Sequence, residues 1–237
     1  MDNETGDNPE VDRSFAKRPD AVAAAPASHS KTVALVGFSC SGKSTLGKRI
    51  LNAFKQSALG PLIYCDSDDE IGEPFGGIAE LYMNLGYDAA LKYVGEKERA
   101  FLNALQPSGA PRLVVPGPNV VLRDPEWQGF LRRVQPIIYY LTISLGECYR
   151  RLRRRDTAAM KKYAGKANAG CWNRGVFRNE NGAEFSEAEA KSHLESNMQI
   201  QLGLYKAANP KLTFDAKELE KGARLGEAMN QVRGDLL

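Results

Sequence analysis

The sequence has few of the residues that build zinc sites or disulfide frameworks. It contains only two histidines and four cysteines in 237 residues, and no two cysteines form a C-x-x-C pair. These widely spaced residues are His29, His193, Cys40, Cys65, Cys148 and Cys171. Such spacing argues against a zinc site and favours reduced thiols, as in a cytoplasmic protein.

Long hydrophobic runs and a strong charge imbalance are also missing. No run approaches the length that a membrane span requires. The net charge of +3 is too small to indicate a nucleic-acid partner by itself. A hydrophobic content of 43% is sufficient for a core, and the length suggests one α/β domain.

The first 30 residues lack the features of a targeting segment. They have neither the basic start and apolar middle of a signal peptide nor the acid-poor composition of a transit peptide. We expect residues 1–30 to be a disordered N-terminal tail or an expression remnant, and residues 31–237 to form the domain.

The most informative segment is residues 37–44, which read G-F-S-C-S-G-K-S. They fit G-x-x-x-x-G-K-[ST], the loop that wraps the phosphates of a nucleoside triphosphate. An apolar run before the loop predicts a buried strand, and the residues after it predict a helix. Exposed N–H groups and the helix N-terminus favour phosphate there.

We expect Lys43 to reach the β- and γ-phosphates and the Ser44 hydroxyl to bind Mg²⁺. The candidate nucleotide-binding residues are Gly37, Ser39, Cys40, Ser41, Gly42, Lys43, Ser44 and Thr45. Cys40 is either a small residue that fits the loop or a reactive thiol.

Apolar runs alternate with helical segments along the rest of the chain. Strands are predicted at residues 32–36, 62–65, 112–115, 137–143 and 212–214. Helices are predicted at residues 45–54, 77–105 (with a break near Gly86 and a second one at Gly95 left open), 124–134 (with Asp124 as N-cap), 145–155, 186–208 (opened by a capping box of Ser186 and Glu189) and 217–236. This alternation predicts an α/β fold whose parallel sheet has helices on both faces. Ligands in such folds bind beyond the carboxyl ends of the strands.

Acidic residues follow the second predicted strand. Asp66 and Asp68 are two residues apart at the end of this strand, where both side chains can point toward one side of a cleft. Phosphoryl transfer requires Mg²⁺ and a carboxylate that orients the attacking hydroxyl. A solvated acidic turn with no chemical role is the alternative interpretation.

From about residue 32 to the C-terminus, the chain resembles the shikimate kinases. The sequences L-V-G-F at residues 35–38 and S-G-K-S-T-L-G at residues 41–47 are similar to the family's L-V-G-F-M-G-x-G-K-S-T-x-G. C-D-S-D-D-E-I at residues 65–71 resembles its D-x-D segment, and C-Y-R-R-L-R-R-R-D at residues 148–156 resembles the basic helix that leads into its lid. The resemblance implies a three-layer P-loop kinase fold with a five-stranded parallel sheet and an extended lid.

The resemblance also implies roles for individual residues. Asp66 would help to hold the Mg²⁺ shell, and Asp68 would bind the hydroxyl groups of the acceptor and serve as base. Arg150 or Arg151 would stack on adenine. Arg154 or Arg155 would lead into the lid that stabilises the transferring phosphoryl group.

The acceptor half departs from the family pattern. The family holds the carboxylate of shikimate with two arginines, whereas this chain has only Lys92 near the first position and Gln201 at the second. Pro118, which has no N–H, replaces a glycine beside Gly117. Either the acceptor differs from shikimate, or Lys92, Arg99 or lid residues bind its carboxylate. The candidate acceptor-binding residues are Asp68, Lys92, Gly117 and Pro118.

The predicted lid, residues 156–185, is longer than that of the family. It interleaves cations with aromatic residues, namely Lys161, Lys162, Lys166, Arg174 and Arg178 with Tyr163, Trp172 and Phe177. Three interpretations are open: a mobile lid over an anionic or ring-bearing acceptor, with Lys166, Trp172 and Arg174 as candidate contacts; a nucleic-acid patch; and a solvated insertion anchored by Trp172.

The sequence thus predicts a cytoplasmic kinase that uses ATP and Mg²⁺ to phosphorylate a hydroxyl of a small polar acceptor, shikimate or a related polyol. One alternative is a nucleotide-binding regulator or catalytically weak relative. The other is a protein that acts on a nucleic acid or nucleotide, and it is the least favoured of the three.

Overall fold

The computed structural model describes residues 31–57, 60–220 and 224–237, so the predicted N-terminal tail lies outside the described residues. Its centre is a sheet of five parallel strands in the order β2-β3-β1-β4-β5. The strands are β1 (Thr32–Gly37), β2 (Ile63–Asp66), β3 (Arg112–Val115), β4 (Ile137–Thr142) and β5 (Leu212–Asp215). The predicted strands and the predicted α/β fold class are confirmed.

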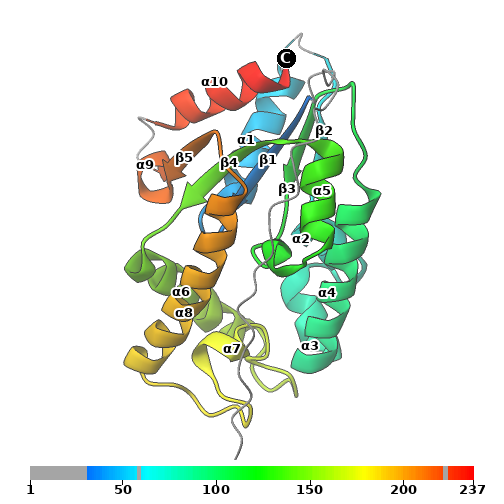
Figure 1. The fold of residues 1–237 in the computed structure, drawn as a ribbon. Coiled ribbons are helices and arrows are strands. Elements are labelled where there is room, and N and C mark those ends of the chain that lie inside the picture. Colours follow the sequence, from blue (N-terminus) through cyan, green and yellow to red (C-terminus); the bar gives the residue numbers. More distant parts are fainter. Residues whose placement is uncertain (1–30, 58–59, 221–223) are drawn as a thin grey trace, which may run out of the picture.

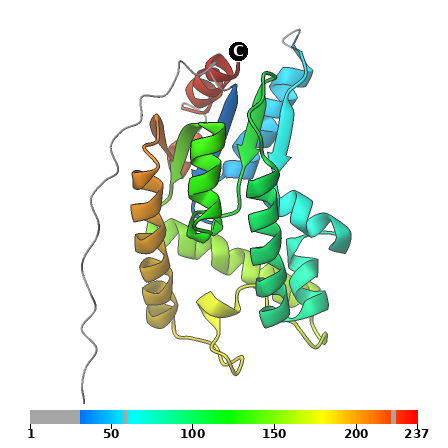
Figure 2. The ribbon, with the colours of Figure 1, turned by 45° about the vertical axis from the view of Figure 1, so that its right-hand side comes forward.

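Helices connect the strands and cover both faces of the sheet (Figures 1 and 2). Their bounds are α1 (Lys43–Lys55), α2 (Ser67–Gly72), α3 (Ile78–Leu85), α4 (Tyr87–Ala104), α5 (Glu126–Val134), α6 (Leu145–Lys162), α7 (Arg174–Phe177), α8 (Glu187–Ala207), α9 (Ala216–Glu220) and α10 (Leu225–Leu236). Short 3-10 turns lie at Glu73–Phe75 and Val120–Leu122. No described helix is long and apolar enough to cross a membrane.

The central strand β1 divides the core into two layers. Its side chains alternate, so Val33 and Leu35 pack with residues of α1 and α10, while Ala34 and Val36 pack with α4, α5 and Tyr205 of α8. Every residue of β1 is buried, which explains why its sequence is an unbroken apolar run. The order of strands places the loop after β1 at the middle of the sheet edge, where β3 and β4 flank it.

Two further apolar clusters lie beyond the carboxyl ends of the strands. One joins α6, α7 and α8, and the other joins α3 and α4 to residues 159–172. In Figure 1 these elements form the lower half of the molecule, with α7 between α8 and α3. The segment after α6 is thus packed against the rest of the protein.

Several predicted helix boundaries are corrected. Helix α5 begins at Glu126 with Pro125 as its N-cap, so the prediction of Asp124 as N-cap is wrong; the Trp127 N–H donates to the Arg123 carbonyl instead. Helix α6 runs to Lys162, because its apolar face continues past residue 155 to buried Ala159.

The predicted helix 217–236 is described as two helices, α9 and α10, on either side of residues 221–223. Helix α3 ends at Gly86 as predicted, whereas α4 passes through Gly95 without a break. The predicted capping box of Ser186 and Glu189 is present.

Candidate active site

The loop between β1 and α1 has a backbone that only certain residues adopt. Gly37 and Gly42 have φ values of 150° and 93°, and Cys40 has a φ of 63°. A Cβ atom on Gly37 would lie 2.4 Å from the Leu141 carbonyl oxygen, so a glycine is required there. Positive φ angles in such a loop turn successive N–H groups toward one concave side, which is the arrangement that binds phosphate.

Lys43 lies on the concave side of this loop. Its ammonium group donates to the carbonyls of Gly37, at 2.8 Å, and Phe38, at 3.1 Å. An ammonium has three protons, so one remains for a phosphate oxygen. Burial lowers the pKa of Lys43, and the nearby carboxylates of Asp68 and Asp66 oppose that shift. The Ser41 hydroxyl of the same loop is buried and has no hydrogen-bond partner among the described residues, which fits a site that a phosphate group completes.

A cavity of about 490 Å³ opens beside the loop. Its lining combines the loop with the basic side of α6 and the apolar residues that follow β5. The predicted nucleotide-binding residues in this lining are Cys40, Ser41, Gly42, Thr45, Arg150 and Arg151, and the predicted catalytic residues in it are Arg154 and Arg155. The size and the composition suit a nucleoside whose phosphates enter the loop.

The two candidate adenine-stacking arginines differ. Arg151 is held on three sides: it donates to the Cys40 carbonyl at 2.9 Å, and it pairs with Glu147 at 2.5 Å and Glu220 at 2.7 Å. It therefore fixes the phosphate loop against α6 and α9. Arg150 contacts only Glu147 among the pairs described, and its side chain is 63% exposed, so it is the freer of the two to move onto a base.

Asp66, the last residue of β2, is fixed by hydrogen bonds to both of its carboxylate oxygens. Asp66 caps α2, because its Oδ1 accepts from the Asp68 N–H at 3.1 Å, and its Oδ2 accepts from the Tyr64 hydroxyl at 3.0 Å. Asp66 is buried at the carboxyl end of β2, and the half-buried Ser44 lies in the first turn of α1. An oxygen-only donor set of one carboxylate and one hydroxyl fits Mg²⁺, which keeps several waters and takes its other ligands from phosphates.

A second cavity, of about 350 Å³, shares Arg155 with the first. Asp68, Pro118 and Arg155 line it, together with residues of α3, α4, α8 and the segment before α7. Burial raises the pKa of Asp68, the Lys43 ammonium opposes this, and the neighbouring Asp66 adds to it. We refer to this space as the acceptor cavity and to the first one as the nucleotide cavity.

Gly117 is not among the described residues that line the acceptor cavity. Its N–H donates to the Ser67 hydroxyl at 2.6 Å. A Cβ atom on Gly117 would lie 2.9 Å from Asp68 Oδ1 and 3.0 Å from Glu98 Oε1. Gly117 therefore allows two carboxylates to approach one another, and its N–H is already used within the protein.

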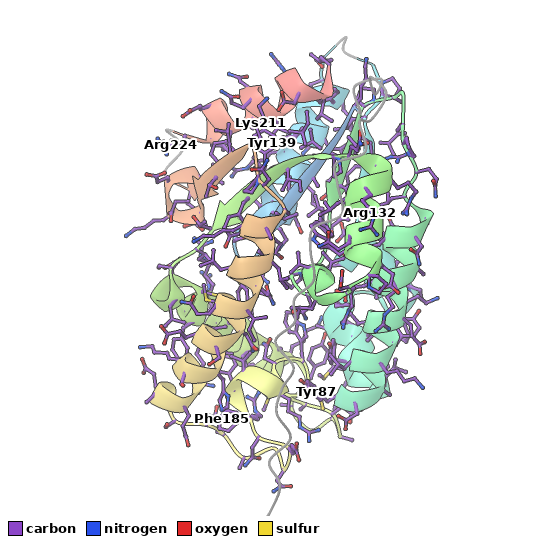
Figure 3. All side chains as sticks on the ribbon, in the orientation of Figure 1. Tyr87, Arg132, Tyr139, Phe185, Lys211 and Arg224 are labelled. Carbon is purple, nitrogen blue, oxygen red and sulfur yellow. The ribbon has the colours of Figure 1, made fainter. Side chains whose placement is uncertain are left out.

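The predicted cationic contacts to the acceptor are not in this cavity. Lys92 is exposed on α4, and Arg99 is half exposed and 3.8 Å from Glu126; neither is among the described residues that line the cavity. Lys166 lies over the Tyr163 ring, and Arg174 lies over the Tyr87 ring. Of the lid candidates, Trp172 lines the acceptor cavity. Figure 3 shows Tyr87 at the lower end of the molecule, close to the lid segment.

Further residues complete the site, of which sequence analysis names only Gln201, as the residue at the family's second arginine position. Glu98 is buried and pairs with Arg123 at 2.7 Å. The Tyr205 hydroxyl donates toward the carbonyls of Pro118, at 2.9 Å, and Gly37, at 3.1 Å, so it ties the phosphate loop to the loop after β3. Gln201 donates to Asn119 at 3.0 Å. The spacing of Glu98 four residues after Val94, on the buried face of α4, was the available signal for an acid that faces inward.

Comparisons with known proteins identify the fold. No protein-family model matches the chain, and no curated protein matches it. A shikimate kinase from Bacteroides thetaiotaomicron superposes with a TM-score of 0.54 at 15% identity, covering 86% of this chain and 96% of that one. A shikimate kinase from Acinetobacter baumannii, solved in complex with shikimate, gives a TM-score of 0.53 at 19% identity, covering 83% and 93%. The chain therefore has a shikimate kinase-like P-loop kinase fold.

Proposed function

We propose that the protein is a phosphotransferase that moves the γ-phosphoryl group of ATP to a hydroxyl of a small polar acceptor. The observation that carries this proposal is the position of Arg155, which lines both the nucleotide cavity and the acceptor cavity. A guanidinium between two such cavities is suited to the charge that develops on a group passing from one to the other.

The residues of the chain supply positioning and charge. The loop N–H groups and Lys43 hold the phosphates, and Lys43 stabilises charge on the leaving oxygen. Asp68 accepts a hydrogen bond from the attacking hydroxyl and takes its proton as the new oxygen–phosphorus bond forms. Ser44, and Asp66 through water, would hold Mg²⁺, which when bound neutralises the phosphate oxygens.

The fold and the cavities together support a small-molecule kinase over the other hypotheses. The acceptor cavity is enclosed by α3, α4, α8 and the lid segment, and its volume of about 350 Å³ suits one small molecule. Several of the lid cations that suggested nucleic acid are engaged within the protein: Arg178 with Asp156, Lys162 with Glu80, and Arg174 over Tyr87. Shikimate or a related polyol remains the acceptor class to test first.

The test is ADP release from ATP and Mg²⁺, measured with and without shikimate and other hydroxylated acceptors. Lys43→Ala serves as the blank and should lose orders of magnitude in turnover. Stimulation by any acceptor in the wild type, with transfer of phosphate to that acceptor, supports the proposal. Tight ATP binding without turnover for every acceptor would instead favour a nucleotide-binding regulator, and near-normal turnover of Lys43→Ala would contradict the proposed site.

A further inference from the structure

The acceptor cavity contains more acidic than basic groups. Among the described residues that line it, Asp68 and Glu98 are acidic and Arg155 is basic. Arg155 also lines the nucleotide cavity, where phosphate oxygens compete for its charge. An acceptor that carried a carboxylate would therefore meet Asp68 and Glu98, whose charges Lys43 and Arg123 already offset, and Arg155 would be the one cation in the described lining for its own charge.

Glu98 is fixed in this position by a partner that lies outside the lining. Its Oε2 accepts from the Arg123 Nε at 2.7 Å, and its side chain is only 2% exposed. The Arg123 guanidinium packs against Gly95, 3.4 Å from where a Cβ atom would stand. Arg123 and Glu98 thus neutralise one another, and Arg123 is not a free cation for a carboxylate acceptor. The other oxygen, Oε1, lies near Gly117, as does Asp68 Oδ1. Both side chains line the acceptor cavity, where carboxylate oxygens accept hydrogen bonds from hydroxyl donors.

Neutral amides make up the rest of the polar lining. Asn119, Asn173, Asn197 and Gln201 all line the cavity. Gln201 is 3% exposed, and its Oε1 has no hydrogen-bond partner among the described residues; neither has the Nδ2 of Asn173. Buried groups of this kind are costly unless a ligand pairs with them. Gln201 Oε1 needs a hydrogen-bond donor and Asn173 Nδ2 needs an acceptor, and a hydroxyl group can serve as either.

Resting on the phosphotransferase activity proposed above, we propose that the acceptor is an uncharged polyhydroxylated ring. Glu98, Asp68 and Gln201 bind its hydroxyl groups, and Trp172 and Tyr82 on the cavity wall cover its apolar faces. The same chemistry is found in a free sugar or cyclitol and in the ribose of a nucleoside. Carboxylated rings, shikimate among them, are selected against because the described lining offers them no cation apart from Arg155, which also lines the nucleotide cavity.

The test uses matched pairs that differ in one charge: shikimate with its methyl ester, and glucuronate with glucuronamide. Transfer to each is measured with ATP and Mg²⁺. We expect kcat/KM for the neutral member to exceed that for the acid by at least about tenfold. Equal or better use of the acid in both pairs would overturn the inference while leaving the proposed kinase activity intact.

A matched pair of variants on α8 tests whether the cavity causes this preference. Asn197 lines the acceptor cavity and Gln199 does not, although both are exposed on the same helix. Asn197→Lys should reduce the ratio of neutral to acidic kcat/KM several-fold, and Gln199→Lys should leave it unchanged. An unchanged ratio in both variants would contradict electrostatic selection by this cavity.

Direct binding separates the inference from the proposed function. Calorimetry with a non-hydrolysable ATP analogue bound measures the affinity for the same pairs, for myo-inositol and methyl glucoside, and for adenosine and uridine. Binding of myo-inositol or methyl glucoside identifies a free ring, and binding of adenosine or uridine identifies a ribose. If no acceptor is phosphorylated, the proposed function fails, yet tighter binding of neutral probes still supports the inference. Tighter binding of the acids, or no binding of any neutral probe at millimolar concentration, would reject it.

Discussion

Asp68 is a carboxylate whose surroundings prepare it for proton transfer. Burial raises its pKa from the ordinary range, Lys43 opposes that shift, and Asp66 reinforces it. We predict that Asp68→Asn lowers kcat by about 10²–10⁴-fold, the usual contribution of a general base, while ATP affinity changes little. In the wild type, kcat should fall on acidification at a pH above that at which ordinary carboxylates titrate, because Asp68 becomes protonated there. The Asp68→Asn variant should not show this fall.

Asp69→Asn is the control for that measurement. Asp69 is the next residue on α2, but its side chain is 55% exposed and pairs with Lys48 on the surface. Its removal should leave kcat and the pH profile nearly unchanged. A loss of ATP affinity in Asp68→Asn as large as the loss of kcat would show that Asp68 supports the nucleotide rather than the acceptor.

Gly37 is the residue on which the phosphate loop depends most sharply. Its φ of 150° is unfavourable for any other residue, and a Cβ atom would stand 2.4 Å from the Leu141 carbonyl. Gly37→Ala should therefore cost more than the roughly 1–3 kcal/mol of backbone strain alone, and should abolish ATP binding. Gly226→Ala on α10, where nothing lies within 4 Å of the new Cβ, should change stability by less than about 1 kcal/mol. Denaturant unfolding of the two variants compares them; equal stabilities would refute the steric argument.

At the scale of elements, α6 and the lid segment are joined by a buried ion pair. Arg178 donates two hydrogen bonds to Asp156, at 2.9 and 2.7 Å, and a third to the Gly170 carbonyl at 3.2 Å. Removing one partner leaves a buried charge, so Arg178→Met should destabilise the protein by about 3–5 kcal/mol. Adding Asp156→Leu should recover part of that loss, because no charge is then left unpaired.

The exposed pair of Arg224 and Glu218 is the control for this cycle. Its side chains are 53% and 50% exposed, so Arg224→Met should cost less than about 1 kcal/mol. Chemical denaturation measures all the variants. A double variant no more stable than Arg178→Met would show that the contact with Gly170, rather than the charge pair, holds the segment.

A second contact between elements depends on pH. Glu80 of α3 accepts hydrogen bonds from Lys162, at 2.6 Å, and from the Tyr163 hydroxyl, and these two donors lower its pKa to about 2. Because the folded pKa lies below the ordinary glutamate value of 4.5, this stabilising contribution is fully present above about pH 5 and is lost as the pH falls toward 2.

Trp172, which belongs to the same apolar cluster, reports on this contact. Acidification through that range should change the fluorescence of Trp172, measured in a Trp127→Phe background, and Glu80→Gln should remove this transition. Persistence of the same transition in Glu80→Gln would assign the pH response to another group.

At the scale of the whole molecule, the sequence predicts those parts of the structure that depend on residues a few positions apart in the chain. The apolar run of β1, the glycines of the phosphate loop and the capping box of α8 each carry their signal within a few positions. The acceptor cavity depends on contacts between distant segments. Glu98 is paired with Arg123 across 25 positions, and Gly117 is bonded to Ser67 across 50. The inward position of Glu98 follows from the period of α4, but its pairing with the distant Arg123 does not.

Arg155 lies between the nucleotide cavity and the acceptor cavity, and the neighbouring Arg154 provides the control. Arg155 lines both cavities, whereas Arg154 lines the nucleotide cavity but not the acceptor cavity. If the phosphoryl group crosses between the cavities, the cation at their junction stabilises the transition state more than either bound substrate. Arg155→Gln should then lower kcat by about 10²–10³-fold with only a few-fold change in either KM. Arg154→Gln should lower kcat by less than about tenfold, because its charge is on one side only. Steady-state kinetics with ATP and the identified acceptor decide this, and equal effects of the two substitutions would mean that the phosphoryl group does not pass Arg155.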